Sequence, residues 1–227
     1  VVCRQLRTRD CDNVDFALFC RTRPIIEAST DMRFSCYDLN YEKLPDHMKA
    51  ARLDVLHNFW SHVYDFTPKA GNWSLLAADA GGVRKLLGSP ELPEAADAAL
   101  GSTSPGALLL TWGDRTPPPS PDYMFVVFPP QAVDKAMAFA EETSAKAVLL
   151  RANKVALPSD SAAAIASAAG WSAKDSKAIA GTAPAVGFEV SGAGCVGALS
   201  GSAKAAGALV TENEAAGSLF RYMGLDG

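Results

Sequence analysis

Several features that would point directly to a familiar chemistry are missing from this chain of 227 residues. No histidine follows His62, so the second half of the chain lacks the nucleophile of a phosphohistidine enzyme. His47, His57 and His62 fall at no metal-ligand spacing and no CxxC pair occurs, so the sequence predicts no metal site. No apolar run approaches the ~20 residues that span a bilayer. A net charge of −4 gives no reason to expect nucleic-acid binding.

The residues that are present have the composition of a soluble globular protein, with 48% hydrophobic and 20% charged residues. Four of the five cysteines fall in the first 40 residues, where small apolar side chains would fill a strand-rich interior. This usage indicates a reducing compartment, and we expect a cytoplasmic protein. The chain opens at Val1 without an initiator Met. We therefore expect a fragment, associated with a membrane only through an anchor that lies upstream.

A short repeat near the N-terminus organises the first domain. Asn13-Val14-Asp15-Phe16 aligns with Asp31-Met32-Arg33-Phe34, eighteen positions later. A repeat of this length cannot bury its own apolar face, so it implies stacked coils of strands. Residues eighteen apart then lie over one another, which places Arg9 against Glu27. Arg7 lies two positions before Arg9 on the same strand face, so the sequence predicts a row of guanidinium groups suited to phosphate or carboxylate.

Composition divides the chain into three parts. Residues 1–80 read as short strands with a helical cover, and residues 81–120 as a linker rich in proline and glycine. In residues 121–227 strands alternate with helices in a βαββαβ-like order, which predicts an α/β ferredoxin-like domain. Its expected elements are strands at 123–128, 148–157, 186–190 and 209–210, and helices at 132–147, 162–169, 194–206 and near Leu219. Gly192-Ala193-Gly194 resembles a phosphate loop only loosely and is read as a strand-to-helix turn.

Several motifs of the first domain match a known family in order. They are Gln5-Leu6-Arg7-Thr8-Arg9-Asp10-Cys11, Arg23-Pro24-Ile25-Ile26-Glu27, Met32-Arg33-Phe34, Asn58-Phe59-Trp60-Ser61, Tyr64-Asp65-Phe66-Thr67-Pro68 and Asn72-Trp73-Ser74-Leu75-Leu76. On these residues the first domain resembles the tubulin-binding cofactor C family, and its retinitis pigmentosa 2 type in particular. The second domain is similar, in element order only, to the nucleoside-diphosphate-kinase-like module of that type. The resemblance implies a right-handed parallel β-helix, represented by its C-terminal coils, before the ferredoxin-like domain.

The resemblance also implies a function. It is that of a GTPase-activating or effector-like protein for an ADP-ribosylation-factor-like small GTPase in its GTP form. In that family an arginine enters the partner's nucleotide site and offsets charge that develops in phosphoryl transfer, and Arg7 occupies its position. Glu27 matches the acidic residue that holds the guanidinium row, with Arg9 and Gln5 in support, and Phe66 matches the interface aromatic. Such a protein is an activator rather than a turnover enzyme and needs no cofactor. The absence of histidine from the second domain argues against an active nucleoside diphosphate kinase.

One position departs from the family pattern. The family reads Gln-Gln-x-Arg where this chain reads Arg4-Gln5-Leu6-Arg7. An arginine cannot accept a hydrogen bond, so Arg4 is a candidate partner-binding residue but cannot orient a water as an amide can. Two other functions stay open: a non-catalytic subunit of a ciliary or other large assembly, and a tubulin-folding factor. The resemblance further implies a location at the cilium or basal body. From spacing alone, Arg7 also fits a solvated strand residue paired with Asp10 or Glu27.

Overall fold

The computed structural model describes residues 1–86, 108–120 and 122–225, which belong to two compact units, Val1–Arg115 and Thr116–Gly227. The linker expected at 81–120 stays a prediction. Its middle, residues 87–107, lies outside the described residues. Its stretch 108–115 belongs to the first unit, where Trp60 Nε1 donates a hydrogen bond of 3.0 Å to Thr111 Oγ1.

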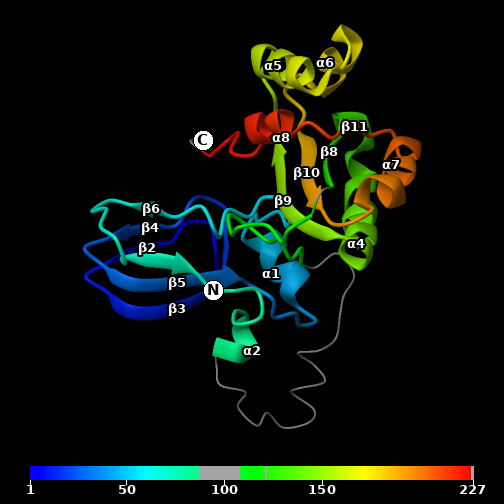
Figure 1. Ribbon diagram of the computed structural model, residues 1–227. Helices are drawn as coiled ribbons and strands as arrows, with labels where there is room; N and C mark the ends of the chain where they lie inside the picture. The colour runs from blue at the N-terminus through cyan, green and yellow to red at the C-terminus, as the bar shows by residue number, and fades with distance from the viewer. Residues whose placement is uncertain (87–107, 121, 226–227) are drawn as a thin grey trace. The chain divides into compact units, whose positions relative to one another are not determined.

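Two parallel sheets build the first unit (Figure 1). One holds, in spatial order, β1 (Val2–Cys3), β3 (Asp12–Cys20), β5 (Thr30–Cys36) and β7 (Trp73–Leu75). The other holds β2 (Arg7–Arg9), β4 (Ile25–Glu27) and β6 (Tyr64–Asp65). The chain therefore alternates between the two layers. The long strands β3 and β5 belong to the first sheet, and the second sheet contains only the short strands β2, β4 and β6.

The predicted eighteen-residue register is confirmed in the long strands. Phe16 on β3 pairs with Phe34 on β5, and their rings stack with centroids 5.2 Å apart. The turns recur at the same interval, since Asp10 and Ala28 have left-handed φ values of 53° and 46°. Both repeats thus need the same tight turn before the next long strand, although this conformation disfavours residues with a Cβ.

The predicted right-handed parallel β-helix, however, is wrong. Both parallel sheets are open, one ending at β1 and β7 and the other at β2 and β6, and neither closes on itself in the described residues. The regular spacing stops after β5, because α1 (Leu44–Ala50) and a turn-rich segment follow it. The next strand to pair with β4 is β6, in which Tyr64 is the register partner of Ile25. The first unit is better described as a sandwich-like pair of short parallel sheets than as a solenoid.

Apolar side chains from both sheets meet in the core of the first unit. Its buried members are Leu18, Cys20, Ile26, Met32, Phe34, Cys36 and Trp60. Ile26, the middle residue of β4, is fully buried, so its neighbours along the strand point to the opposite, outer face. The three-stranded sheet therefore presents polar and aromatic side chains to solvent. A second cluster packs Leu44 and Met48 of α1 against Phe19 and Tyr37, and the short helix α2 (Val83–Leu86) follows β7.

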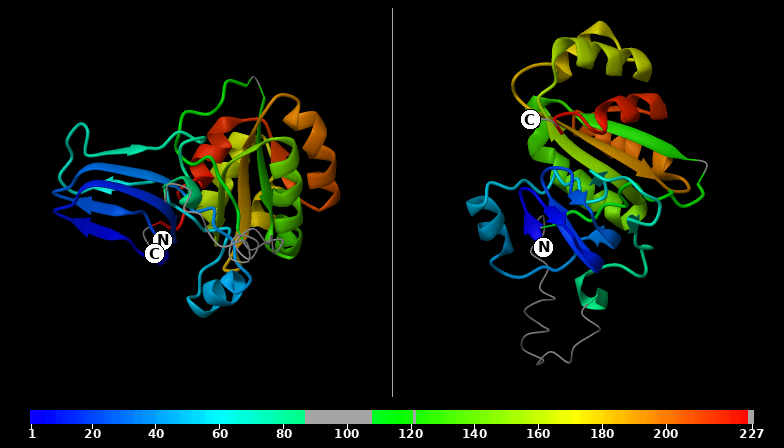
Figure 2. Two further views of the ribbon diagram at one scale, coloured as in Figure 1. Left: turned by 90° about the horizontal axis from the view of Figure 1, so that it is seen from below. Right: turned by 90° about the vertical axis from the view of Figure 1, so that its left-hand side faces the viewer.

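The second unit is built on one antiparallel sheet. In spatial order its strands are β11 (Leu209–Thr211), β8 (Tyr123–Phe128), β10 (Ala185–Ser191) and β9 (Val148–Val155). Its helices are η1 (Pro130–Lys135), α4 (Ala136–Lys146), α5 (Ser159–Ala169), α6 (Ala173–Ile179), α7 (Cys195–Ala205) and α8 (Glu214–Phe220). Figure 2 shows α4 and α7 on one side of this sheet and α8 on the other. The fold class of the chain is therefore mixed, with parallel sheets in one unit and an antiparallel sheet in the other.

Most individual elements of the second unit lie where the sequence predicts them. The strand at 123–128 coincides with β8. The other seven expected elements are present with shifted boundaries, and the helix expected at 132–147 is divided into η1 and α4. The sequence reasoning missed α6. Its signal is readable, because Ser172 and Asp175 form a capping box in which each side chain accepts from the other residue's backbone N–H.

Candidate functional site

The outer face of the three-stranded parallel sheet carries four of the six predicted site residues: Arg7, Arg9, Glu27 and Phe66. Arg7 pairs with Ile25 in register, Arg9 with Glu27, and Ile25 in turn with Tyr64. Because side chains alternate along a strand, every second residue of β2, β4 and β6 reaches this face. We call it the docking face and define it by six residues: Arg7, Arg9, Arg23, Glu27, Tyr64 and Phe66.

Arg7 is exposed on the docking face but is held in place. Its side chain is 56% exposed, and its Nη2 donates to Glu27 Oε2 at 2.9 Å. Its guanidinium carbon lies 5.7 Å from the centroid of the Phe66 ring, within reach of a cation–π contact. A guanidinium has five N–H donors and Glu27 engages one of them, so the group is oriented while most of the side chain stays exposed.

Glu27 is the carboxylate between the two arginines. Its side chain is 19% exposed, and its other oxygen, Oε1, lies 4.0 Å from Arg9 Nη1. The hydrogen bond from Arg7, and to a smaller extent the charge of Arg9, lowers the pKa of Glu27 below its usual value. Arg9 itself is 69% exposed and also lies 3.6 Å from Asp10. Arg7, rather than Arg9, is thus the arginine that Glu27 fixes at hydrogen-bonding distance.

Two exposed aromatic side chains complete the docking face, and one of them was missed by the sequence reasoning. Tyr64 and Phe66 are 40% and 56% exposed, and their rings meet edge to face at 5.8 Å. The guanidinium of Arg23 lies over the Tyr64 ring at 4.6 Å, which parallels the contact of Arg7 with Phe66. Adjacent exposed aromatic and arginine side chains are the residue types that most often anchor protein interfaces. The alternation of Tyr64 and Phe66 around Asp65 would have signalled this pair.

Arg4 and Gln5 lie apart from this cluster. Both are exposed in the bend between β1 and β2, and Arg4 is held through its carbonyl oxygen, which accepts from the Thr22 backbone N–H and hydroxyl. Among the residues that the structure describes, neither side chain has a polar contact with Arg7 or Glu27. The structure therefore brings four predicted site residues together, Arg7, Arg9, Glu27 and Phe66, and leaves these two beside the strand.

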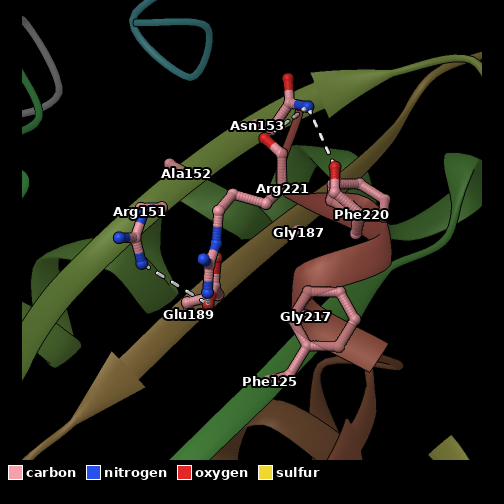
Figure 3. A pocket seen from close by; sticks show the side chains of 9 residues that line it. All are labelled: Phe125, Arg151, Ala152, Asn153, Gly187, Glu189, Gly217, Phe220 and Arg221. Carbon is pink, nitrogen blue, oxygen red and sulfur yellow. Dashed lines mark hydrogen bonds and ion pairs between the residues drawn. The ribbon is translucent and has the colours of Figure 1, made fainter. Parts of the chain in front are cut away.

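The second unit contains a buried ion cluster that the sequence reasoning also missed (Figure 3). Glu189 on β10 is 3% exposed and accepts from Arg221 at 2.8 and 2.7 Å and from the Tyr123 hydroxyl at 3.0 Å. Arg151 lies 3.7 Å from the same carboxylate. Burial, and then the negative charge of Glu189, raises the pKa of Tyr123, so its hydroxyl remains a donor. The cluster lines a small cavity beside α8 and ties the C-terminal helix to the sheet.

A glycine motif between β10 and α7 has a similarly structural explanation. Gly192, Gly194 and Gly197 have the GxGxxG spacing of a nucleotide loop, a match that the sequence reasoning did not recognise. A carboxylate oxygen of Asp122, however, accepts from the Gly194 N–H at 2.6 Å, where a phosphate would otherwise bind. Both neighbours of β10 are antiparallel to it, whereas a dinucleotide fold needs parallel strands at this position. The strand-to-helix turn is therefore the better reading.

Within residues 1–86, 108–120 and 122–225, no cluster of three or more His, Cys, Asp or Glu residues is arranged to hold a metal ion. His47 and His62 instead contact Tyr41 and Asp114, at 2.9 and 3.4 Å. No helix in this described part is long and apolar enough to cross a membrane.

Comparison with known proteins identifies the class to which the docking face belongs. Residues 1–66 match the family described as tubulin binding cofactor C, a range that ends on Phe66 and contains the whole face. This part of the first unit is thus similar to the tubulin binding cofactor C family.

The more particular resemblance to the retinitis pigmentosa 2 type is also confirmed. The chain is similar to Protein XRP2 of Xenopus laevis, with 42% identity over 118 residues, which are 51% of this chain and 33% of that protein. It is 51% identical to Protein XRP2 of Danio rerio over 82 residues, 35% of this chain and 22% of that protein. Tubulin-folding cofactor C of Arabidopsis thaliana is 40% identical over 76 residues, 32% of this chain and 22% of that protein. The chain thus spans at most about a third of these relatives.

Proposed function

We propose that the chain binds an ADP-ribosylation-factor-like small GTPase in its GTP form through the docking face, and that Arg7 stimulates GTP hydrolysis in the partner. The observation that carries this proposal is the exposed but oriented guanidinium of Arg7, held by Glu27 at 2.9 Å. A flexible surface arginine would have to be ordered on binding, at a cost in side-chain entropy. Arg7 has already lost part of that freedom, so more of the binding energy remains for the reaction.

The chemistry asked of Arg7 is electrostatic. In GTP hydrolysis water attacks the γ-phosphorus while the bond to the β-phosphate oxygen breaks. Negative charge is then spread over the oxygens of the phosphoryl group that is transferred. A guanidinium placed beside them donates hydrogen bonds that strengthen as that charge develops. An arginine supplied in this way accelerates GTPases roughly 10³–10⁵-fold. Arg7 neither gains nor loses a proton in this step, which suits an activator that is not itself consumed.

The remaining residues of the docking face have supporting roles in this proposal. Glu27 orients Arg7, and Arg9 adds positive charge that attracts a nucleotide-bearing partner. The exposed Phe66 and Tyr64 rings supply apolar contact area. Arg4 lies outside the face, in the bend before β2, and its guanidinium can donate to a partner but cannot accept from a water. The proposal therefore expects strong partner binding with a weaker positioning of the attacking water.

Single-turnover hydrolysis is the test of this function. ADP-ribosylation-factor-like GTPases loaded with GTP are mixed with the chain, and phosphate release is followed with wild type, Arg7→Ala and Arg7→Lys. Both variants should lose nearly all stimulation, because a lysine cannot reproduce the planar fork of donors. Lys49→Ala on α1 is the matched control that removes one exposed positive charge away from the face, and it should stimulate like wild type. Stimulation that survives in Arg7→Ala would refute the role of Arg7.

A second candidate partner is tubulin. The likeness to Tubulin-folding cofactor C over 76 residues supports it, as does the match of residues 1–66 to the tubulin binding cofactor C family. One pulldown distinguishes the two candidate partners. It tests GTP-loaded GTPase, GDP-loaded GTPase and tubulin dimers in parallel. Capture that depends on the GTP form supports the first proposal, whereas capture of tubulin alone supports the second.

A further inference from the structure

Two cysteine thiols of the first unit lie next to each other, outside the docking face. Cys3 on β1 and Cys20 on β3 are register partners on adjacent parallel strands. Their sulfur atoms are 3.8 Å apart although the residues are separated by 17 positions. Neighbouring strands are about 4.8 Å apart, which falls inside the Cα separation of about 4.4–6.8 Å that a disulfide accepts. Side-chain rotation at the two residues is therefore the main movement needed to bring the sulfurs into bonding distance.

The two thiols have different environments, and the difference assigns them different roles. Cys20 is fully buried in the core of the first unit, whereas Cys3, on the two-residue strand β1, is only partly buried. The contact with Cys20 lowers the pKa of Cys3 to about 7, because a thiolate formed at Cys3 would accept the S–H that Cys20 otherwise donates to the Arg4 carbonyl oxygen at 3.8 Å. The same contact, together with burial, raises the pKa of Cys20. Cys3 is thus the accessible nucleophile and Cys20 the protonated partner.

We propose that Cys3 and Cys20 form a peroxide-reactive thiol pair, in which Cys3 is oxidised and Cys20 then closes an intramolecular disulfide. In the first step the Cys3 thiolate attacks one oxygen of hydrogen peroxide and the O–O bond breaks. Cys3 becomes a sulfenic acid and the peroxide leaves as hydroxide. In the second step the Cys20 sulfur attacks the Cys3 sulfur, the S–O bond breaks, and the departing hydroxide takes the Cys20 proton as water. Two thiols and one peroxide yield one disulfide and two waters, and a dithiol reductant reverses the change.

The other three cysteines lack the combination of partial exposure and a neighbouring thiol that Cys3 has. Cys36 and Cys195 are buried, and burial raises the pKa of both, to about 11 for Cys36. Cys11 is partly buried like Cys3, but its sulfur contacts the carbonyl oxygen of Arg9 at 3.4 Å instead of a second thiol. Cys11 is therefore an internal control of similar exposure without a resolving partner. Closure of the disulfide would leave the backbone of Arg4 held, because the Thr22 N–H and hydroxyl still donate to its carbonyl oxygen.

The experiment exposes the full chain to a small excess of hydrogen peroxide, traps the remaining thiols with N-ethylmaleimide and digests the protein. Trypsin leaves Cys11 and Cys20 on one peptide, 10–21, so fragmentation spectra must show which of them is linked to Cys3. We expect the Cys3–Cys20 link, its loss on treatment with dithiothreitol, and N-ethylmaleimide on Cys11. In an alkylation assay at pH 7 without oxidant, Cys3 should react at least about tenfold faster than Cys36, because burial raises the pKa of Cys36 to about 11 and leaves little thiolate there.

Variants separate the two steps. In Cys20→Ser, or in Cys20→Ala if the serine is not tolerated in the core, Cys3 should accumulate as a sulfenic acid that dimedone captures. In Cys3→Ser the buried Cys20 should stay reduced, and in Cys11→Ser the Cys3–Cys20 link should form as in wild type. Equal oxidation of Cys3 and Cys11 without a Cys3–Cys20 link in the wild-type protein would overturn the proposal. That measurement needs no variant and is independent of any GTPase assay.

Discussion

Arg7 and Glu27 lie 20 residues apart in the chain, yet Arg7 Nη2 donates to Glu27 Oε2 at 2.9 Å on the outer face of a parallel sheet. The pair bridges two neighbouring strands, so its geometry depends on the register of the sheet and not on local sequence. A charged side chain fixed in this way remains available to a partner while its own freedom is reduced.

The ionisation of Glu27 should report whether Arg7 is bound to it. Because the folded-state pKa of Glu27 is lowered, its pairing is fully present above the usual carboxyl value of 4.5 and is lost as pH falls through the lower, folded-state pKa. An NMR titration of the Glu27 carboxyl carbon should therefore have its midpoint below 4.5 in wild type. In Arg7→Ala the midpoint should move up towards the usual value. A midpoint that does not respond to Arg7→Ala would show that the two side chains are not paired in solution.

Removing the Phe66 ring should weaken partner binding without unfolding the protein. The ring is 56% exposed, so its truncation leaves no cavity in the core. Loss of an aromatic anchor in an interface costs on the order of 2 kcal/mol, so Phe66→Ala should raise the Kd for the GTP-loaded partner more than tenfold. Leu110→Ala, which removes a 54% exposed apolar side chain of the same unit, is the control. Similar affinity for both variants and wild type would place the interface elsewhere.

Glu189 should be essential to the stability of the second unit. Glu189→Gln leaves Arg221 and Arg151 facing a neutral amide in a buried site, and breaking one side of such a cluster costs about 3–5 kcal/mol. Hydrogen exchange of the β10 amides as a function of urea measures this loss directly. Glu142→Gln, which breaks a surface i,i+4 pair with Lys146 on α4, should cost no more than about 0.5 kcal/mol. Comparable effects of the two substitutions would contradict the structural role of Glu189.

Gly217 on α8 should not tolerate a methyl group. A Cβ at this position would collide with the Tyr123 hydroxyl and crowd the Glu189 side chain, so Gly217→Ala should destabilise the second unit by about 1–3 kcal/mol. The double variant Gly217→Ala with Tyr123→Phe should recover part of that loss, since the colliding oxygen is gone. Gly197→Ala on α7 has open space around its Cβ and is expected to be neutral or slightly stabilising. Thermal unfolding of the three variants tests the packing of α8 on the sheet.

The wrong β-helix prediction shows which structural features a sequence repeat can predict and which it cannot. Phe16 and Phe34 do stack at the predicted interval, because a parallel register is visible wherever two similar repeats follow each other. The prediction extended that interval to a whole solenoid. The insertion of α1 before Tyr64 ends the regular spacing, and the sheets remain short and open. A repeat in sequence fixes which residues are neighbours, but not how many strands a sheet will contain.

The sequence by itself determined the strand periods, the eighteen-residue register that sets Arg9 opposite Glu27, and the absence of a histidine nucleophile from the second unit. These features follow from the local alternation of apolar and polar residues and from composition, both of which can be read directly from the sequence. Only the tertiary structure decided that Glu27 binds Arg7 more closely than Arg9, that Tyr64 and Phe66 stand beside them, and that Cys3 meets Cys20. The same holds for Glu189, whose partners come from β8, β9 and the residue that follows α8. Such contacts join distant segments, and their geometry is set by the packing of whole sheets and helices rather than by any one stretch of sequence.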